Sequence, residues 1–295
     1  MTTRNWLITG VSSGFGREFA TQLLDRGEVV AGTVRRPDSV AGLVRKYPDT
    51  FHRELLDVTD AAAVRDVVDR SFTSLGRIDV VVSNARYGPF GAAEELSDEQ
   101  VAHIIATNLT GSIHLIRASL PHLRAQGGGR IIQISSYGGQ VAFPGNSMYH
   151  ATKWGIEGFA ESGAQEVAPF GIGVTIVEPG GARTEFRYGS AQVADLMPAY
   201  DGTPAHGFLA MLDPRRRARP RRPRPHGRRH HRQRRPGTRP AAHHPRIASP
   251  ADHCRRPQGP NRRLRSAGRP GRLDRLPTRT MTRTGAQGRG LVITR

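Results

Sequence analysis

Short runs of apolar and β-branched residues alternate with segments whose apolar residues recur at helical spacing as far as Val177. Several of these runs are apolar at successive positions, which is typical of strands buried on both faces of a parallel sheet. The pattern predicts strands over residues 6–9, 29–34, 54–58 (the end of a strand), 78–82, 130–134 and 173–177. It predicts helices over residues 17–25, 61–75, 98–107, 111–125 and 148–167.

This strand–helix alternation predicts an α/β fold, a Rossmann-like doubly wound parallel sheet with helices on both faces. Sheets of this kind bind ligands outside the carboxyl ends of their strands. The residues that directly follow each strand are therefore the first candidates for a functional site.

No such pattern is present after Asp213. The 295-residue chain carries a formal net charge of +19 at pH 7, yet residues 1–213 are mildly acidic, while residues 214–295 hold 26 Arg, no Lys and two acids. A segment with so few large apolar residues cannot bury enough surface to offset the entropy of ordering it. We therefore expect a domain at residues 1–212, followed by a disordered, Arg/Pro-rich basic tail at residues 213–295.

Two interpretations of this tail stay open. Arg, Pro, Gly, Ala and His are what GC-rich coding DNA yields in a wrong reading frame, which favours a frameshifted terminus. A genuine tail of this charge would instead bind nucleic acid through the phosphates. No aromatic residue interleaves with the arginines, so a base-stacking surface is absent and we do not expect a nucleic-acid partner.

Composition also bears on compartment and on metals. The single cysteine, Cys254, allows no intrachain disulfide, and no basic segment with a long apolar stretch precedes the first strand, so we expect a cytoplasmic protein without membrane spans. The histidine pairs at 230–231 and 243–244 lack the spacing of a metal site, and none is expected.

A glycine-rich segment, Thr-Gly-Val-Ser-Ser-Gly-Phe-Gly, follows the first predicted strand and opens the first helix. Glycines in such a turn let backbone N–H groups and the positive end of the helix approach a pyrophosphate. The plainer interpretation is a flexible turn, but the strand–turn–helix context favours dinucleotide binding. The candidate residues are Gly10, Ser12, Ser13, Gly14, Phe15 and Gly16.

The end of the second predicted strand indicates which dinucleotide is used. An acid there would bind the ribose 2′-hydroxyl of NAD(H), whereas an arginine accommodates the 2′-phosphate of NADP(H). Arg35 and Arg36 follow this strand, and Asp38 lies beyond a proline. The two arginines could also be solvated loop charges, but the missing acid favours NADP(H), with Arg35 as the phosphate-binding residue.

Tyr149 and Lys153 stand four residues apart, on one face of the last predicted helix. A cation next to the phenol favours phenolate and should lower the tyrosine pKa, which lets the pair exchange a proton with an alcohol or carbonyl. The chain contains only two lysines against 42 arginines. A lysine retained here indicates a role that a guanidinium cannot fill.

Taken together, these motifs resemble the short-chain dehydrogenase/reductase family over about residues 4–210. They are the glycine-rich turn, Asn-Ala after the fourth strand, Ser-Ser after the fifth, Tyr-x-x-x-Lys and Pro-Gly. The resemblance implies a nicotinamide cofactor, Tyr149 as acid/base, Lys153 contacting the cofactor ribose and Ser136 polarising the substrate oxygen. Ser135 would then only cap a turn.

The resemblance implies roles for further residues. Asn108 would position a water in a proton relay, and Asp57 would lie near the adenine amino group. Asn84 belongs to the cofactor site, and Pro179, Gly180 and Thr184 match the segment that binds the nicotinamide carboxamide. A homodimer or homotetramer is implied as well.

Two departures from the family pattern stand out. Arg86 replaces the glycine of Asn-Asn-Ala-Gly, where a long side chain would either obstruct the cofactor or add a phosphate contact. The family's seventh strand is missing from the sequence, so the sheet should end at the strand over residues 173–177 with an open edge.

We therefore expect an NADP(H)-dependent oxidoreductase that acts on a ketone, an aldehyde or a secondary alcohol. The segment 180–212 contains apolar and aromatic residues that favour a small apolar substrate, although they could also be packing residues: Phe186, Tyr188, Met197, Tyr200 and Phe208. Two alternatives remain, a non-catalytic nicotinamide-binding scaffold and a nucleic-acid-binding protein that acts through its tail.

Overall fold

The computed structural model describes residues 3–180 and 192–212. Thr184, Phe186, Tyr188 and the basic tail lie outside the described residues, so the expectations for them, and the domain boundary at residue 212, stay predictions. No helix within the described part of the chain is long and apolar enough to cross a membrane.

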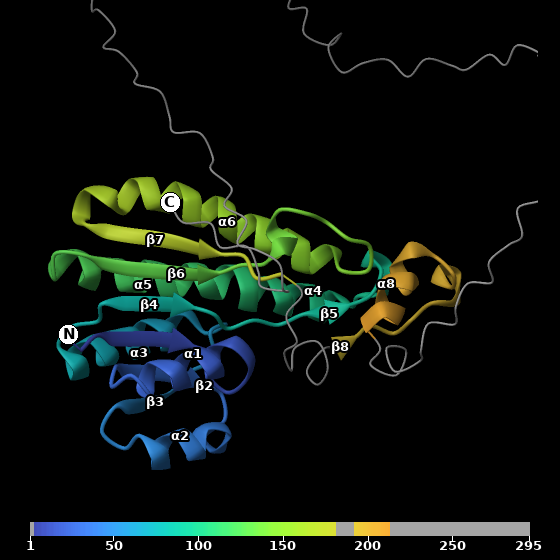
Figure 1. Cartoon of the computed structure of the whole chain (residues 1–295). Helices are drawn as coiled ribbons and strands as arrows, with labels where there is room; N and C mark the ends of the chain where they lie inside the picture. The colour runs from blue at the N-terminus through green and yellow to red at the C-terminus, as the bar shows by residue number, and fades with distance from the viewer. Residues whose placement is uncertain (1–2, 181–191, 213–295) are drawn as a thin grey trace, which may run out of the picture. The chain divides into compact units, whose positions relative to one another are not determined.

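Six parallel strands form one sheet in the order β3-β2-β1-β4-β6-β7 (Figure 1). The strands are β1 (Asn5–Thr9), β2 (Val29–Val34), β3 (Phe51–Leu55), β4 (Val80–Ser83), β6 (Gly129–Ile134) and β7 (Ile172–Val177). This is the strand order of a doubly wound nucleotide-binding sheet, and it confirms the predicted Rossmann-like α/β fold. Strand order reverses between β1 and β4, which places a ligand crevice at their carboxyl ends.

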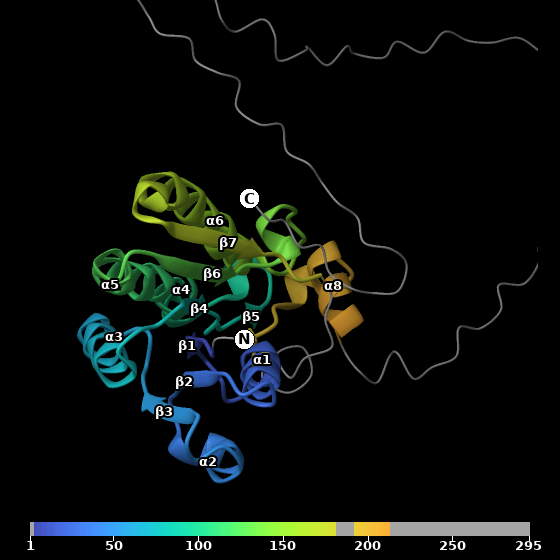
Figure 2. The same cartoon turned by 60° about the vertical axis from the view of Figure 1, so that its left-hand side comes forward.

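Helices cover both faces of the sheet, with α3 and α5 on one side and α1 on the other (Figure 2). Successive residues of β1 point to opposite faces of the sheet, because Leu7 packs with α3 and α5 whereas Ile8 packs with α1. The helices are α1 (Gly14–Leu24), α2 (Ala41–Lys46), α3 (Ala61–Leu75), α4 (Asp98–Ile105), α5 (Gly111–Ala125), α6 (Ser147–Val167) and α8 (Pro204–Leu212). Short 3-10 turns are η1 (Pro37–Val40), η2 (Ala93–Glu95), η4 (Tyr137–Gly139), η5 (Ala168–Phe170) and η6 (Pro198–Tyr200).

The third strand and the fourth helix differ from the predictions. The third strand ends at Leu55 rather than Val58, so residues 56–58 form the loop that leaves the sheet. The helices predicted over 98–107 and 111–125 are joined without a break, because the π-helical turn η3 (Ala106–Thr110) connects α4 to α5. Such π turns occur frequently at functional sites.

Besides the short helix α2 and the 3-10 turns, three elements were not predicted at all. The strands β5 (Pro89–Phe90) and β8 (Gln192–Val193) pair in a small second sheet, and α8 lies in the segment 180–212, for which no helix was predicted. Two-residue strands carry no periodicity that a sequence pattern can reveal. Within the described residues β7 pairs only with β6, and the open edge expected there stays a prediction.

Candidate active site

Steric fit explains the glycines of the turn between β1 and α1. Gly10 has φ +74°, and a Cβ atom there would lie 3.0 Å from the Cα of Ala85. A Cβ on Gly16 would lie 2.3 Å from the carbonyl oxygen of Gly10 and 2.5 Å from the side-chain nitrogen of Asn84. The turn therefore packs directly against the residues that follow β4.

The start of α1 suits an anionic group. Ser13 is the N-cap residue, in an extended conformation, and its hydroxyl makes no capping hydrogen bond to the helix. Helix N-termini carry unsatisfied N–H groups and partial positive charge, both of which bind phosphate. The donor set of this turn therefore fits the pyrophosphate of a dinucleotide.

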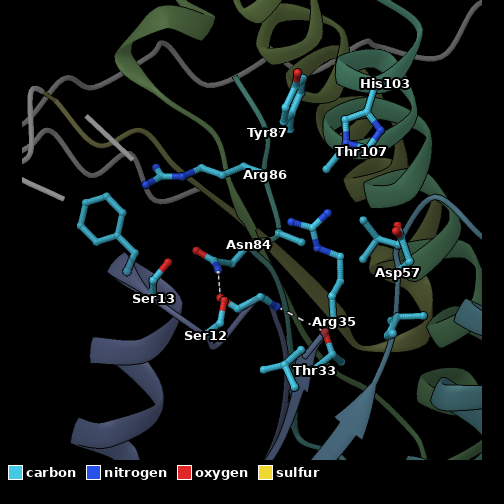
Figure 3. A pocket seen from close by; sticks show the side chains of 16 residues that line it. Ser12, Ser13, Thr33, Arg35, Asp57, Asn84, Arg86, Tyr87, His103 and Thr107 are labelled. Carbon is cyan, nitrogen blue, oxygen red and sulfur yellow. Dashed lines mark hydrogen bonds between the residues drawn. The ribbon is translucent and has the colours of Figure 1, made fainter. Parts of the chain in front are cut away.

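A pocket of about 190 Å³, called here the glycine-turn pocket, opens at the carboxyl ends of β1, β2 and β4 (Figure 3). Asn84 links the loop after β4 to the end of β1, because its Nδ2 atom donates to the carbonyl oxygens of Thr9 (2.8 Å) and Gly10 (3.1 Å). The predicted residues that line the pocket are Gly10, Ser12, Ser13, Phe15, Arg35, Asp57 and Asn84. Gly14 and Gly16 are not among the residues that line this pocket, and their role in cofactor binding stays a prediction.

Arg35 and Asp57 lie at the same end of this pocket, and Figure 3 shows the Arg35 side chain reaching into it beside Asp57. Burial raises the pKa of the Asp57 carboxyl, but the N–H and hydroxyl of Thr59, 3.0 and 2.8 Å from its Oδ1 atom, outweigh that effect. The charges of Arg35 and His103 add to the lowering of this pKa. Asp57 is therefore a carboxylate at neutral pH and can accept hydrogen bonds from a ligand.

His103, Thr107 and Tyr87 also line the pocket, although sequence reasoning did not propose them. His103 and Thr107 come from α4 and η3, and the ring of Tyr87 packs edge-on against His103 with centroids 4.5 Å apart. Their position depends on how α4 packs across the sheet. No motif in the sequence could have indicated it.

A second group of predicted residues meets beside α6; Ser136, Tyr149 and Lys153 are called here the α6 cluster. Tyr149 and Lys153 lie on one face of α6 and are only 7% and 2% exposed. The Nζ atom of Lys153 lies 5.7 Å from the Tyr149 ring centre and donates to the carbonyl oxygen of Ile134 at 2.9 Å. The hydroxyl of Ser136 is hydrogen-bonded to the Tyr149 side chain.

Of the two serines after β6, it is Ser136 rather than Ser135 that caps a turn. Ser136 caps the turn η4, because its Oγ atom accepts from the N–H of Gly138 at 3.0 Å. Ser135 instead donates to the buried carboxylate of Glu157. The prediction that Ser135 caps the turn is therefore wrong. Successive residues leaving a strand point to opposite sides, which brings only Ser136 to Tyr149.

The prediction that Lys153 lowers the pKa of Tyr149 is wrong for this structure. Burial raises the pKa of Tyr149, and the Ser136 hydrogen bond and the positive charge of Arg86 only partly oppose it. Burial also lowers the pKa of Lys153 to about 7, with a further lowering by Arg86 and an opposing effect from Glu157. A nearby charge alone would favour phenolate, but the cost of burying the phenol outweighs that effect.

Asn108 lies in η3 and links the two groups of residues. Its side-chain oxygen accepts from the backbone N–H of Tyr87 at 2.7 Å, and its nitrogen donates to the Tyr87 carbonyl (2.8 Å) and the Thr152 hydroxyl (3.3 Å). The amide thus fastens the loop after β4 to α6. The water-positioning role implied for Asn108 stays a prediction.

Two further predicted features lie at the margin of the site. The carbonyl oxygen of Pro179 accepts from the N–H of Tyr137 at 3.0 Å, which places Pro179 and Gly180 beside η4. Arg86 lines the glycine-turn pocket, with its guanidinium carbon 5.8 Å from the ring centre of Phe15. No group of three or more acidic, histidine or cysteine side chains within the described residues could hold a metal ion.

Comparison with known proteins gives consistent matches. A family model described as short chain dehydrogenase matches residues 4–193. Oxidoreductase BOA17 of Botryotinia fuckeliana is 40% identical over 68% of this chain and 74% of its own length. The 3-ketodihydrosphingosine reductase of Bacteroides thetaiotaomicron is also 40% identical, over 61% of this chain and 64% of its own length. The chain thus spans less than two thirds of that second relative.

Solved structures match as well. A short-chain dehydrogenase from Streptomyces avermitilis is 39% identical with a TM-score of 0.66, and the match covers 71% of this chain and 78% of that one. The structure of ElxO with NADP bound is 29% identical with a TM-score of 0.60, and the match covers 64% of this chain and 79% of that one.

Proposed function

Because the chain belongs to the short-chain dehydrogenase/reductase family of oxidoreductases, we propose that it uses NADP(H) to interconvert a small apolar ketone or aldehyde and the corresponding alcohol. The observation that carries this proposal is the α6 cluster, which joins a hydroxyl, a phenol and an ammonium in a largely buried space. Asn108 fastens this cluster to the loop that lines the glycine-turn pocket.

The glycine-turn pocket supports the choice of cofactor. Its turn offers a helix N-terminus to the pyrophosphate, and Arg35 at the end of β2 offers a guanidinium to a ribose 2′-phosphate. Asp57 would accept a hydrogen bond from the adenine amino group. The similar structure of ElxO with NADP bound is in line with this choice.

The bound nicotinamide would supply a hydride to the carbonyl carbon, or accept it back from the alcohol. The residues of the α6 cluster would control the proton. Burial keeps the pKa of Tyr149 above its ordinary value, so the phenol is protonated at neutral pH and can donate to the carbonyl oxygen during reduction. Ser136, already hydrogen-bonded to that phenol, would donate to the same oxygen and polarise the carbonyl.

The phenolate formed by this transfer would face two cations, Arg86 and Lys153. Arg86 already favours the charged form of Tyr149. The ammonium of Lys153 is held within 5.7 Å of the ring by its hydrogen bond to Ile134. A lysine whose pKa lies at about 7 is also matched to passing protons at neutral pH.

An aromatic group near α6 supports an apolar substrate. Phe143 stacks on Phe208 with ring centroids 6.2 Å apart, and the ring centroid of Phe90 lies 6.4 Å from that of Phe208. Phe143 also lies 5.7 Å from His150, the residue that follows Tyr149. Tyr200, in contrast, directs its hydroxyl to Glu94 at 2.7 Å. One of the similar proteins is named 3-ketodihydrosphingosine reductase.

Isotope transfer tests the proposal. The full chain is incubated with NADPH that carries deuterium at the transferable C4 position and with a panel of apolar ketones and aldehydes. Mass spectrometry and NMR should find one deuterium on the carbinol carbon of the product. NADPH binding without turnover of any carbonyl would favour the scaffold alternative, and failure to bind NADPH would contradict the proposal.

A further inference from the structure

Arg86 occupies the part of the site where the glycine-turn pocket approaches the α6 cluster. It lines the pocket together with Ser12, Ser13 and Phe15. Its guanidinium carbon lies 5.8 Å from the Phe15 ring centre, beside the first turn of α1. Its charge also acts on Tyr149 and Lys153, so the same guanidinium is close to both groups of residues.

The charge balance of the pocket indicates what this guanidinium is for. Among the described residues that line the pocket, Arg35 and Arg86 contribute two permanent positive charges and Asp57 contributes one negative charge. The N-terminus of α1 adds further positive potential. Burial lowers the pKa of Arg86, which shows that its charge is held partly away from water. A pocket of this kind is complementary to a ligand with more than one phosphate group.

Figure 3 separates the two arginines by position. Arg35 lies toward Asp57, at the ends of β2 and β3, whereas Arg86 extends toward Ser13, at the start of α1. The 5.8 Å distance from its guanidinium carbon to the Phe15 ring centre agrees with this position. The first place suits the adenosine ribose, and the second suits the phosphates that a helix N-terminus would bind.

We propose that Arg86 is a phosphate-binding residue whose guanidinium contacts the pyrophosphate of the dinucleotide, while Arg35 binds the 2′-phosphate. This inference rests on the proposed cofactor, but it assigns Arg86 a separate contact. It also explains how a long side chain can stand where the family pattern has glycine. The guanidinium would bind the negatively charged pyrophosphate rather than block the cofactor.

Three ligands distinguish the two arginines in direct binding measurements on the full chain. NADPH contains both phosphate sites, NADH lacks the 2′-phosphate, and adenosine 2′-monophosphate lacks the pyrophosphate. Arg86→Met should lower the affinities for NADPH and NADH alike, by about ten- to a hundredfold for the loss of one charge-assisted contact. It should leave the affinity for adenosine 2′-monophosphate unchanged. Arg35→Ala should weaken NADPH and adenosine 2′-monophosphate and spare NADH.

An unchanged affinity for adenosine 2′-monophosphate would also show that the pocket of the Arg86→Met variant is folded. Arg86→Lys keeps the charge without the bidentate geometry, so its affinity for NADPH and NADH should lie between those of the wild type and Arg86→Met. If Arg86→Met or Arg86→Gly binds NADPH as well as or better than the wild type, the guanidinium obstructs or ignores the cofactor and this inference is overturned while the proposed function stands. If the wild type binds neither dinucleotide, both are overturned.

Discussion

Two charged side chains of the glycine-turn pocket, Arg35 and Asp57, are exposed, whereas the α6 cluster buries the groups that would move a proton. Arg35 and Asp57 are exposed at the ends of their strands, while Lys153 is only 2% exposed and hydrogen-bonded to the backbone. An exposed charge recognises a ligand without a large change in its own pKa. A buried group has a shifted pKa, which is the property that acid–base chemistry requires.

The two regions should therefore fail in different ways when they are altered. Changes in the glycine-turn pocket should affect affinity and cofactor choice, and changes in the α6 cluster should affect turnover and the response to pH.

The largest effect is expected for Lys153→Met. Loss of the ammonium should reduce turnover by about 10²–10⁴-fold, the usual contribution of a positioned acid–base group. Steady-state kinetics with NADPH and a carbonyl compound that the wild type reduces measure this change. The chain offers a matched control, because its other lysine, Lys46, is exposed and pairs with Asp25 at 3.0 Å on the surface. Equal turnover in Lys153→Met and Lys46→Met would remove Lys153 from the proposed mechanism.

Arg35→Ala should act on affinity alone. Loss of one charge-assisted contact to the 2′-phosphate should raise the Kd for NADPH by about ten- to a hundredfold and leave NADH binding nearly unchanged. Fluorescence titration measures both. Arg36→Ala is the matched control, since Arg36 is not among the residues that line the pocket. Parallel losses for NADPH and NADH would show that Arg35 does not read the 2′-phosphate.

A smaller effect concerns stability. The pKa of Lys153 is about 7 in the folded protein, against an ordinary value of 10.5, so between these values the unfolded chain binds more protons. The free energy of unfolding should therefore rise with pH across this window, by up to about 1.4 kcal/mol per pH unit from this group. Denaturant titrations at pH 7 to 9 should show this dependence reduced in Lys153→Met but not in Lys46→Met. Identical pH dependence in both variants would contradict the buried, shifted lysine.

The smallest effect is local and concerns α8. The ring nitrogens of His206 contact Glu95 at 2.7 Å and Asp201 at 3.1 Å, and Glu95 also accepts from the N–H of Met197 at 2.8 Å. The hydrogen bond to Glu95 raises the pKa of His206 against the effect of burial, with a further contribution from Asp201. A raised histidine pKa stabilises the folded state below the ordinary value of about 6.5, and this stabilisation is lost as pH rises through the folded value.

Hydrogen exchange should therefore show residues 192–212 better protected at pH 6 than at pH 9, after correction for the intrinsic rate. His206→Gln should abolish this difference. His122→Gln, at a surface pair with Asp69, should not. Unaltered protection in His206→Gln would show that the pair does not hold α8.

Local steric and helical rules explain why much of the site could be predicted from the sequence. Gly10 takes a positive φ of +74° and Gly16 packs against the Gly10 carbonyl within the same turn, and Tyr149 and Lys153 share a face because they are four residues apart in a helix. Partners distant in the chain could not be predicted. Asn108 bonds to Tyr87, 21 residues away, and the pKa shifts depend on burial that only the packed sheet and helices create. The cytoplasmic location and the homo-oligomer stay predictions.

Tyr149→Phe tests the central claim most directly, because it removes one oxygen atom from the α6 cluster and leaves the glycine-turn pocket intact. NADPH affinity and carbonyl turnover are measured on the same preparation of the full chain. We predict that the Kd for NADPH changes less than about twofold while turnover falls by about 10²-fold or more. A variant that binds NADPH normally and retains most of the wild-type turnover would contradict Tyr149 as the proton donor, and with it the proposed division of the site.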